Sequence, residues 1–327
     1  MRGVVGRKVG LRGASRRLAA SVAALAPALA LAMAMAMACN DVVEDRTRER
    51  VEASGLLSVH VVNHPLEYFT ARIGAGHVDV VFPAPRDLDP AFWMPPPETI
   101  AAYQEADLII ENGAGYARWI GQASLPRGRR VDTSAGFRDR WIAQGRGVSH
   151  GHGPEGEHSH VGTAFTTWLD PMLAKQQARA IASALISLRP AARANFEAAL
   201  GALEADLDAL DRALARAFEP YAAERLLFSH PVYQYLARRY SLEGRSLDWE
   251  PDEMPDEPAW STFSRMLEER PARILLFEAE PDTEMARRLS AMGIRIIVYE
   301  PAGNRPAQGD WLSTMRSNVE RLALPAH

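Results

Sequence analysis

Short apolar runs alternate with helical patterns from residue 56 to the end of the chain. Six runs rich in β-branched residues are expected to be strands: 56–62, 78–82, 107–112, 225–230, 272–278 and 294–300. Strands that alternate with helices are typical of βαβ units, which form parallel sheets. Because the runs fall into two groups of three, the pattern predicts an α/β protein with two Rossmann-like lobes, each built on a parallel sheet.

Two helical segments lie between the two groups of strands. The first begins at Asp170, a residue type that caps helices, with Pro171 at the first helical position, and it continues to about residue 188. In the second segment, 191–218, leucines recur every three or four residues, and the helix would be roughly 40 Å long. That length predicts one long linking helix between an N-terminal lobe over 56–190 and a C-terminal lobe over 219–327, although an amphipathic surface helix has the same pattern.

The first 38 residues have a different character, with six basic residues, no acidic residue and a long Ala-rich apolar stretch. This order is typical of an export signal, and Pro27 disfavours a spanning helix. The stretch ends at Cys39, preceded by small residues in a pattern that resembles the lipobox of bacterial lipoproteins. We expect a signal peptide over 1–38, lipid attachment at Cys39 and a polar tether over 39–55, hence an exported protein that is periplasmic or a membrane-anchored lipoprotein. The alternative for Cys39 is an incidental thiol.

Composition narrows the classes of protein further. The 327 residues, 47% of them hydrophobic, are enough for about two domains. Cys39 is the only cysteine, which excludes an internal disulfide and a cysteine-ligated zinc site. Without the first 38 residues the formal net charge falls from −4 to −10, with 31 basic and 41 acidic residues. A chain without a basic surplus is not expected to bind nucleic acid.

Candidate metal ligands follow the predicted strands, where open parallel sheets bind their ligands. These residues are His64 after the first run, His230 after the fourth, Glu278 and Glu280 after the fifth, and Glu300 after the sixth. Imidazole and carboxylate groups together suit a divalent transition metal such as zinc or manganese. Each residue is equally consistent with a polar position where the chain turns to solvent.

A second candidate is the glycine- and histidine-rich segment over 144–165. It contains four of the nine histidines, in two H-x-H pairs: His150, His152, His158 and His160. Histidine-rich tracts bind metals, so we expect an auxiliary metal-capturing loop. A solubilising loop is the alternative.

Several motifs give the chain a family resemblance that extends over about residues 56–325. They are Trp168-Leu169-Asp170-Pro171, Ser229-His230-Pro231 and Ala106-Asp107-Leu108-Ile109-Ile110. In these motifs and their order the chain resembles the zinc/manganese substrate-binding proteins of bacterial ABC importers. The resemblance implies two α/β lobes bridged by a helix, one metal ion in the cleft between them, and delivery to an ABC permease in the inner membrane. We further expect a monomer, and a role in cell adhesion is compatible with this family.

The chain departs from the family's metal-binding pattern at two positions. The family's first histidine is replaced by Ala91 and its second by Thr166, whereas His230 matches the third, and Glu300 stands where the family commonly has aspartate. We therefore expect His230 and Glu300 to bind the metal ion, with His64 and then Glu278 as substitutes.

Capture of a divalent ion, zinc before manganese, is the leading functional hypothesis. The alternative is a receptor of the same fold for a metal chelate or a small organic solute, because Ala91 and Thr166 replace two ligands. We do not expect an enzyme, since the sequence has no H-E-x-x-H, G-x-S-x-G or phosphate-binding glycine motif.

Overall fold

The computed structural model describes residues 55–144, 150–152, 156–158 and 162–324. The predicted signal peptide, Cys39 and nearly all of the tether therefore lie outside the described residues, as does His160. The described residues from Leu56 onward form one compact unit. Within the described ranges, no helix combines the length and the apolar character needed to cross a membrane.

The N-terminal lobe contains a parallel sheet with strand order β2-β1-β3-β4. Its strands are β1 (Leu57–Val61), β2 (Val78–Val81), β3 (Leu108–Glu111) and β4 (Arg130–Asp132). The helices of this part of the chain are α2 (His64–Gly74), α3 (Pro97–Glu105) and α4 (Pro171–Leu188). Helix α4 begins as predicted, because the Asp170 side chain accepts a hydrogen bond from the Met172 N–H at 2.9 Å.

The C-terminal lobe repeats this architecture with strand order β10-β9-β11-β12, again all parallel. Its strands are β9 (Arg225–Phe228), β10 (Glu243–Ser246), β11 (Ile274–Phe277) and β12 (Arg295–Val298). Its helices are α6 (Gln234–Arg239), α7 (Glu257–Glu269), α8 (Thr283–Ala291) and α9 (Trp311–Ala323). The core of this lobe packs α7 and α8 against β11 through side chains such as Trp260, Met285 and Leu275.

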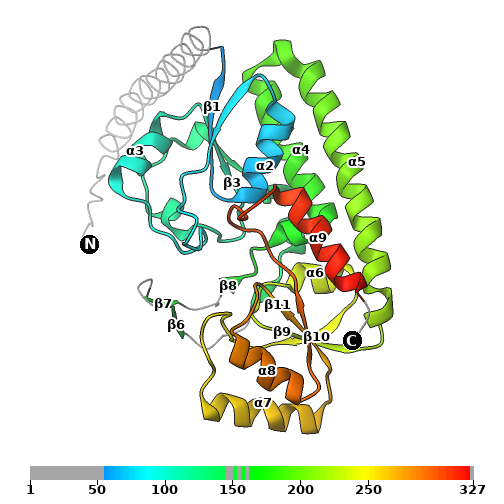
Figure 1. Cartoon of the computed structure of the whole chain (residues 1–327). Helices are drawn as coiled ribbons and strands as arrows, with labels where there is room; N and C mark the ends of the chain where they lie inside the picture. The colour runs from blue at the N-terminus through cyan, green and yellow to red at the C-terminus, as the bar shows by residue number, and fades with distance from the viewer. Residues whose placement is uncertain (1–54, 145–149, 153–155, 159–161, 325–327) are drawn as a thin grey trace, which may run out of the picture. The chain divides into compact units, whose positions relative to one another are not determined.

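Helix α5 (Arg193–Phe218) has 26 residues and runs alongside both lobes (Figure 1). Its apolar stripe, which includes Leu203, Leu207 and Leu214, is buried. This arrangement confirms the predicted fold class of two α/β lobes with parallel sheets joined by one long helix.

Short elements connect these parts. The 3₁₀ helices are Arg118–Gly121, Arg127–Arg129, Ala135–Arg140, Thr167–Leu169, Pro190–Ala192 and Glu219–Tyr221. Two small antiparallel ladders pair β5 (Ala143–Gln144) with β8 (Gly162–Thr163) and β6 (His150–His152) with β7 (Gly156–His158).

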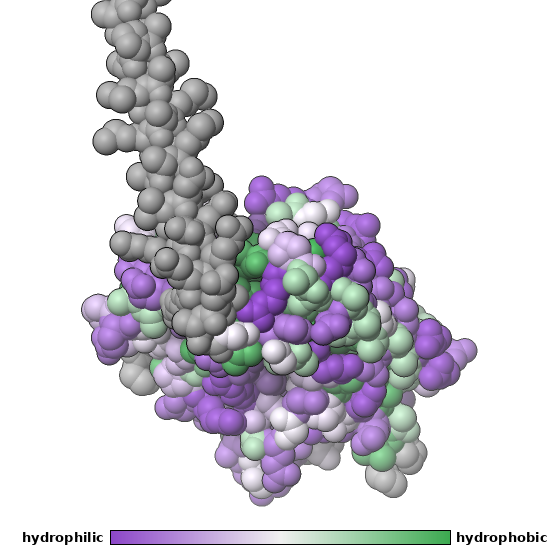
Figure 2. Space-filling view, turned by 90° about the horizontal axis from the view of Figure 1, so that it is seen from above, coloured by the Kyte–Doolittle hydropathy of each residue, from purple (hydrophilic) through white to green (hydrophobic). Residues whose placement is uncertain are grey.

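The face of the molecule in Figure 2 mixes hydrophilic and hydrophobic residues. Among the described residues, the large hydrophobic side chains with high exposure are scattered along the chain: Leu56, Met94, Leu188, Met254 and Leu324.

Candidate metal centre

Three strands of the C-terminal sheet direct metal-type ligands to the same edge. His230 lies just beyond β9, Glu278 follows β11 directly, and Glu250 lies in the segment after β10. Because β9 and β11 are apolar and buried, the first polar residues beyond them lie at the carboxyl edge of the sheet. Each of the three residues offers one ligand atom, and these atoms lie within 4.8 Å of one another. We call these residues the His230 cluster.

Main-chain pairing explains how Glu250 reaches the cluster. The Leu247 N–H donates to the Phe228 carbonyl at 2.7 Å and the Trp249 N–H donates to the Ser229 carbonyl at 3.0 Å, so the chain continues beside β9 after β10 ends. The Trp249 ring is buried against Trp260, with the ring centroids 4.7 Å apart. Hydrophobic packing therefore anchors the residue before Glu250.

Both carboxylates approach the same nitrogen of the His230 imidazole. Its Nδ1 is 3.0 Å from Oε1 of Glu250 and 3.5 Å from Oε1 of Glu278, and the residue is only 4% exposed. One imidazole and two carboxylates are a nitrogen and oxygen donor set that suits zinc or manganese. The three donors follow three neighbouring strands of the sheet, β10, β9 and β11, so the fold itself brings them together.

Proximity changes the protonation of these groups. Shielding from water raises the pKa of Glu278 to about 7, and the charges of Glu250 and Asp89 add to this effect against the opposing charge of His230. Burial alone would lower the pKa of His230, but its contact with Glu250 and the charge of Glu278 outweigh burial and raise that pKa. The cluster therefore holds protons near neutral pH, and a divalent cation would displace them.

The structure brings together two of the four predicted metal ligands, His230 and Glu278. Glu300 is not in the cluster, and its Oε1 lies 2.8 Å from a guanidinium nitrogen of Arg321. His64 is not in it either: it is the first residue of α2, and its Nδ1 contacts Oε2 of Glu67 at 2.9 Å.

Sequence reasoning missed Glu250. The residue follows β10, whose sequence Glu-Gly-Arg-Ser has no apolar run, so no strand was predicted there. The available signal was the acidic segment 248–257 with Trp249 at its start, because an aromatic residue there implies an anchored loop.

The N-terminal lobe contacts the chain directly after His230. The Thr166 hydroxyl donates to the Val232 carbonyl, and the Gln144 amide donates to the Pro231 carbonyl at 3.2 Å. Ala91 and Thr166, the two positions that depart from the family pattern, are 2% and 4% exposed. The histidine-rich segment forms the β6–β7 ladder, in which His150 pairs with His158.

Comparisons with known proteins concern the family and the fold of the chain. The family model described as "Zinc-uptake complex component A periplasmic" (ZnuA) matches residues 59–324. The high-affinity zinc uptake system protein ZnuA of Bacillus subtilis is 24% identical over 248 residues, which are 71% of this chain and 75% of that protein. The zinc-binding lipoprotein AdcA of Streptococcus pneumoniae is 22% identical over 283 residues, which are 83% of this chain but 56% of that protein. The crystal structure of the metal-dependent lipoprotein YcdH from Bacillus subtilis superposes with a TM-score of 0.69 at 21% identity, over 81% of this chain and 97% of that one.

Proposed function

This chain belongs to the ZnuA family of periplasmic zinc-uptake components, and from that premise we propose that it is an exported receptor that captures zinc and delivers it to an ABC permease in the inner membrane. Its ligand is a divalent metal ion, as in the zinc uptake and zinc-binding relatives. The family is a transport family, so the ion is cargo and no covalent chemistry is required.

The observation that carries the proposal is the His230 cluster. Three ligand atoms within 4.8 Å of one another can converge on one ion, and two carboxylates balance the charge of a divalent cation. Burial of His230 favours a bound ion over a transient surface contact. We propose His230, Glu250 and Glu278 as the protein ligands. We leave out Glu300 and His64, because Arg321 and Glu67 engage their side chains.

Two further parts of the proposal concern segments beyond these three residues. The histidine-rich segment with His150, His152, His158 and His160 would collect metal ions for the cluster, as such tracts bind metals. Lipid attachment at Cys39 would keep the receptor at the membrane that holds its permease.

A second candidate ligand is a metal chelate, which is favoured because the cluster offers only three protein ligand atoms. Zinc is commonly four-coordinate, so three protein ligands leave one position for water or for an external donor atom. The N-terminal lobe has Ala91 and Thr166 where the family has imidazoles, and the Thr166 hydroxyl is bonded to Val232. Mass spectrometry of the protein after mild purification distinguishes a bare ion from a bound organic molecule.

Calorimetric titration of the mature chain with zinc tests the proposed function. We expect His230→Ala to weaken binding by more than about 100-fold, because even residues that only orient a ligand contribute about 10- to 100-fold. Glu250→Gln and Glu278→Gln should also weaken binding. Glu280→Gln is the matched control, since Glu280 is exposed and lies on the same loop outside the cluster. Wild-type affinity in His230→Ala would contradict the assignment, and no zinc binding by the wild type would contradict the function.

A further inference from the structure

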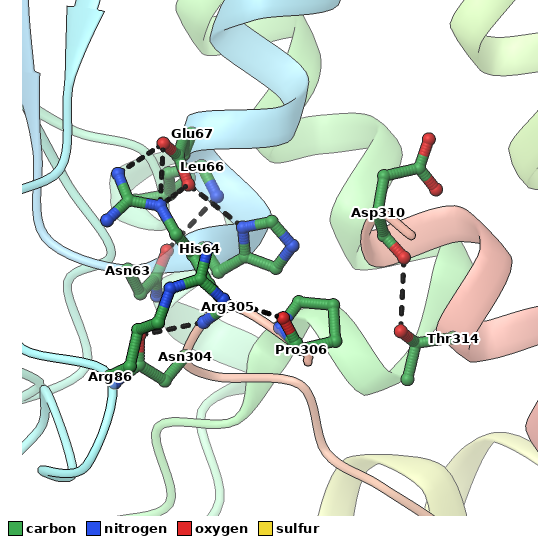
Figure 3. A network of polar contacts seen from close by, with 10 residues as sticks. All are labelled: Asn63, His64, Leu66, Glu67, Arg86, Asn304, Arg305, Pro306, Asp310 and Thr314. Carbon is green, nitrogen blue, oxygen red and sulfur yellow. Dashed lines mark hydrogen bonds and ion pairs between the residues drawn. The ribbon is translucent and has the colours of Figure 1, made fainter. Parts of the chain in front are cut away.

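The segment after β12 connects the C-terminal lobe to the N-terminal lobe. We call residues 301–306 the strap. Hydrogen bonds join the strap to the N-terminal lobe. Three of them are donated to carbonyls of the strap: from Trp168 Nε1 to Pro301 at 2.8 Å, from the His64 N–H to Gly303 at 3.0 Å, and from the Arg86 guanidinium to Pro306 at 2.9 Å. In a fourth, the Asn304 amide of the strap donates to the Leu88 carbonyl at 2.8 Å. Figure 3 shows the last three residues of the strap together with Glu67 and Arg86, the partners of Arg305 and Pro306.

A further contact is an ion pair between Arg305 and Glu67. Two nitrogens of the Arg305 guanidinium donate to the two carboxylate oxygens of Glu67, with Nε to Oε2 at 3.0 Å, and the guanidinium also lies 4.7 Å from the centroid of the Phe82 ring. The same carboxylate accepts from Nδ1 of His64 (Figure 3). The Glu67 side chain is 19% exposed. A two-point pair with this little exposure is more directional than a solvated surface pair.

The charge state of Glu67 agrees with this geometry. Burial alone would raise its pKa, but the hydrogen bonds and charges of His64 and Arg305 outweigh burial and lower the pKa. Glu67 is therefore ionised at neutral pH and available to Arg305.

The backbone of the strap is held close to the N-terminal lobe. Ala302 has a φ of 53°, in the left-handed region that a residue with a Cβ rarely adopts. At the next residue, Gly303, a Cβ would lie 3.4 Å from the Trp168 ring. Strained backbone persists only where surrounding contacts hold it, and here those contacts come from the other lobe.

The strap is coupled to the His230 cluster through the sheet. Strand β12 pairs with β11, and the Tyr299 N–H donates to the Phe277 carbonyl at 2.7 Å, directly before Glu278. On the β9 side, Thr166 contacts the Val232 carbonyl two residues after His230. The N-terminal lobe thus holds the chain on both sides of the cluster, and separation of the lobes there requires the strap to detach.

We propose that Arg305 is a positioning residue that, through Glu67, controls how readily the lobes separate and so how fast the metal ion leaves the cluster. This inference rests on the proposed function, since it concerns release of the ion from that site. Arg305 contacts no residue of the cluster. A change at Arg305 should therefore alter the rate of metal release more than the coordination of the metal ion.

Zinc release from the mature chain into an excess of chelator, followed by stopped flow, tests the inference. We expect Arg305→Met to release zinc about tenfold faster, because loss of one partner of a partly buried charge pair acts mainly on dissociation. Arg305→Lys should lie between Arg305→Met and the wild type. The charge-reversed pair Glu67→Arg with Arg305→Glu should restore slow release, which a general loss of packing would not do. Arg270→Met is the matched control, since Arg270 pairs with Glu243 inside the C-terminal lobe.

Distances between spin labels supply a readout that does not depend on zinc. Labels on cysteines introduced at the exposed positions Ala102 of α3 and Ser261 of α7, in a Cys39→Ser background, report the separation of the lobes. Arg305→Met should broaden this distance distribution, and the charge-reversed pair should narrow it again. Unchanged distances and release rates in Arg305→Met would overturn the inference. If the wild type bound no zinc, the proposed function would fail, and the label distances alone would decide the role of the strap.

Discussion

The chemistry of the His230 cluster depends on which groups carry protons. The pKa of Glu278 is raised to about 7, so part of this carboxyl group carries a proton at neutral pH, and the pKa of His230 is also raised. Metal ligands must be deprotonated, so protons compete with the ion. An ordinary glutamate would already be ionised across the physiological range, with a pKa of about 4.3. The burial that shapes the site therefore makes it sensitive to pH.

We predict that zinc affinity decreases as the pH falls from about 8 to about 6, by up to about tenfold per pH unit for each proton released. The sign follows because the raised pKa of Glu278 leaves a growing fraction of the carboxyl group protonated below about 7. Titrations in buffers of different ionisation enthalpy count the released protons. Glu278→Gln, which cannot ionise, should bind more weakly and show a flatter pH profile. A wild-type affinity that stayed constant over this interval would contradict the competition.

At the scale of elements, the sequence predicts the strands that form apolar runs and misses the strands that do not. The six predicted strands are rich in apolar residues, and the structure confirms them as four central strands (β1, β3, β9 and β11) and two edge strands (β2 and β12). The edge strands β4 and β10 were missed, since their sequences, Arg-Val-Asp and Glu-Gly-Arg-Ser, contain no apolar run. Glu250 was missed for the same reason, because it follows β10. The departures at Ala91 and Thr166 were visible in the sequence, whereas the partner of Glu300 depends on a tertiary contact with Arg321. The partner of His64 is local, since Glu67 lies three residues later on the same helix.

We predict that Gly244→Ala in β10 weakens zinc binding although Gly244 is not a ligand. A Cβ at this position would lie 2.3 Å from the ring of Phe228, so the ring or β10 has to shift, and we expect β10 to move away from β9 and take Glu250 with it because Phe228 is buried. Overpacking of this kind costs about 1–3 kcal/mol of stability. Gly201→Ala in α5 is the control, since nothing lies within 4 Å of its added Cβ. It should stabilise the helix by about 0.5–1 kcal/mol. Urea denaturation and zinc titration of both variants check these results, and unchanged zinc affinity in Gly244→Ala would refute the coupling of β10 to the site.

At the scale of the whole molecule, helices from both lobes interlock on α5. The Trp311 ring of α9 packs edge-to-face on Phe69 of α2, with the centroids 4.9 Å apart. Asp206 of α5 pairs with Arg72 of α2 at 2.9 Å and with Arg316 of α9 at 3.1 Å. The ion pairs are half-exposed and contribute little, whereas the buried aromatic contact contributes more. The N-terminal lobe, the linking helix and the C-terminal lobe therefore share one packed region, and neither lobe can unfold without exposing it.

We predict a single cooperative transition in differential scanning calorimetry of the mature chain, with and without zinc, although the proposed ligands all lie on the C-terminal lobe. Zinc at about 1,000 times its dissociation constant should stabilise the folded state by about 4 kcal/mol, and the whole transition should shift upward. His230→Ala should keep the single transition and lose the zinc-induced shift. Trp311→Ala removes the shared contact without touching the cluster, so it should lower the transition temperature and separate the lobes into two transitions, of which zinc raises only one. Two transitions in the wild type would show that the lobes unfold independently. That result would contradict the proposed coupling of the lobes through the shared helical region.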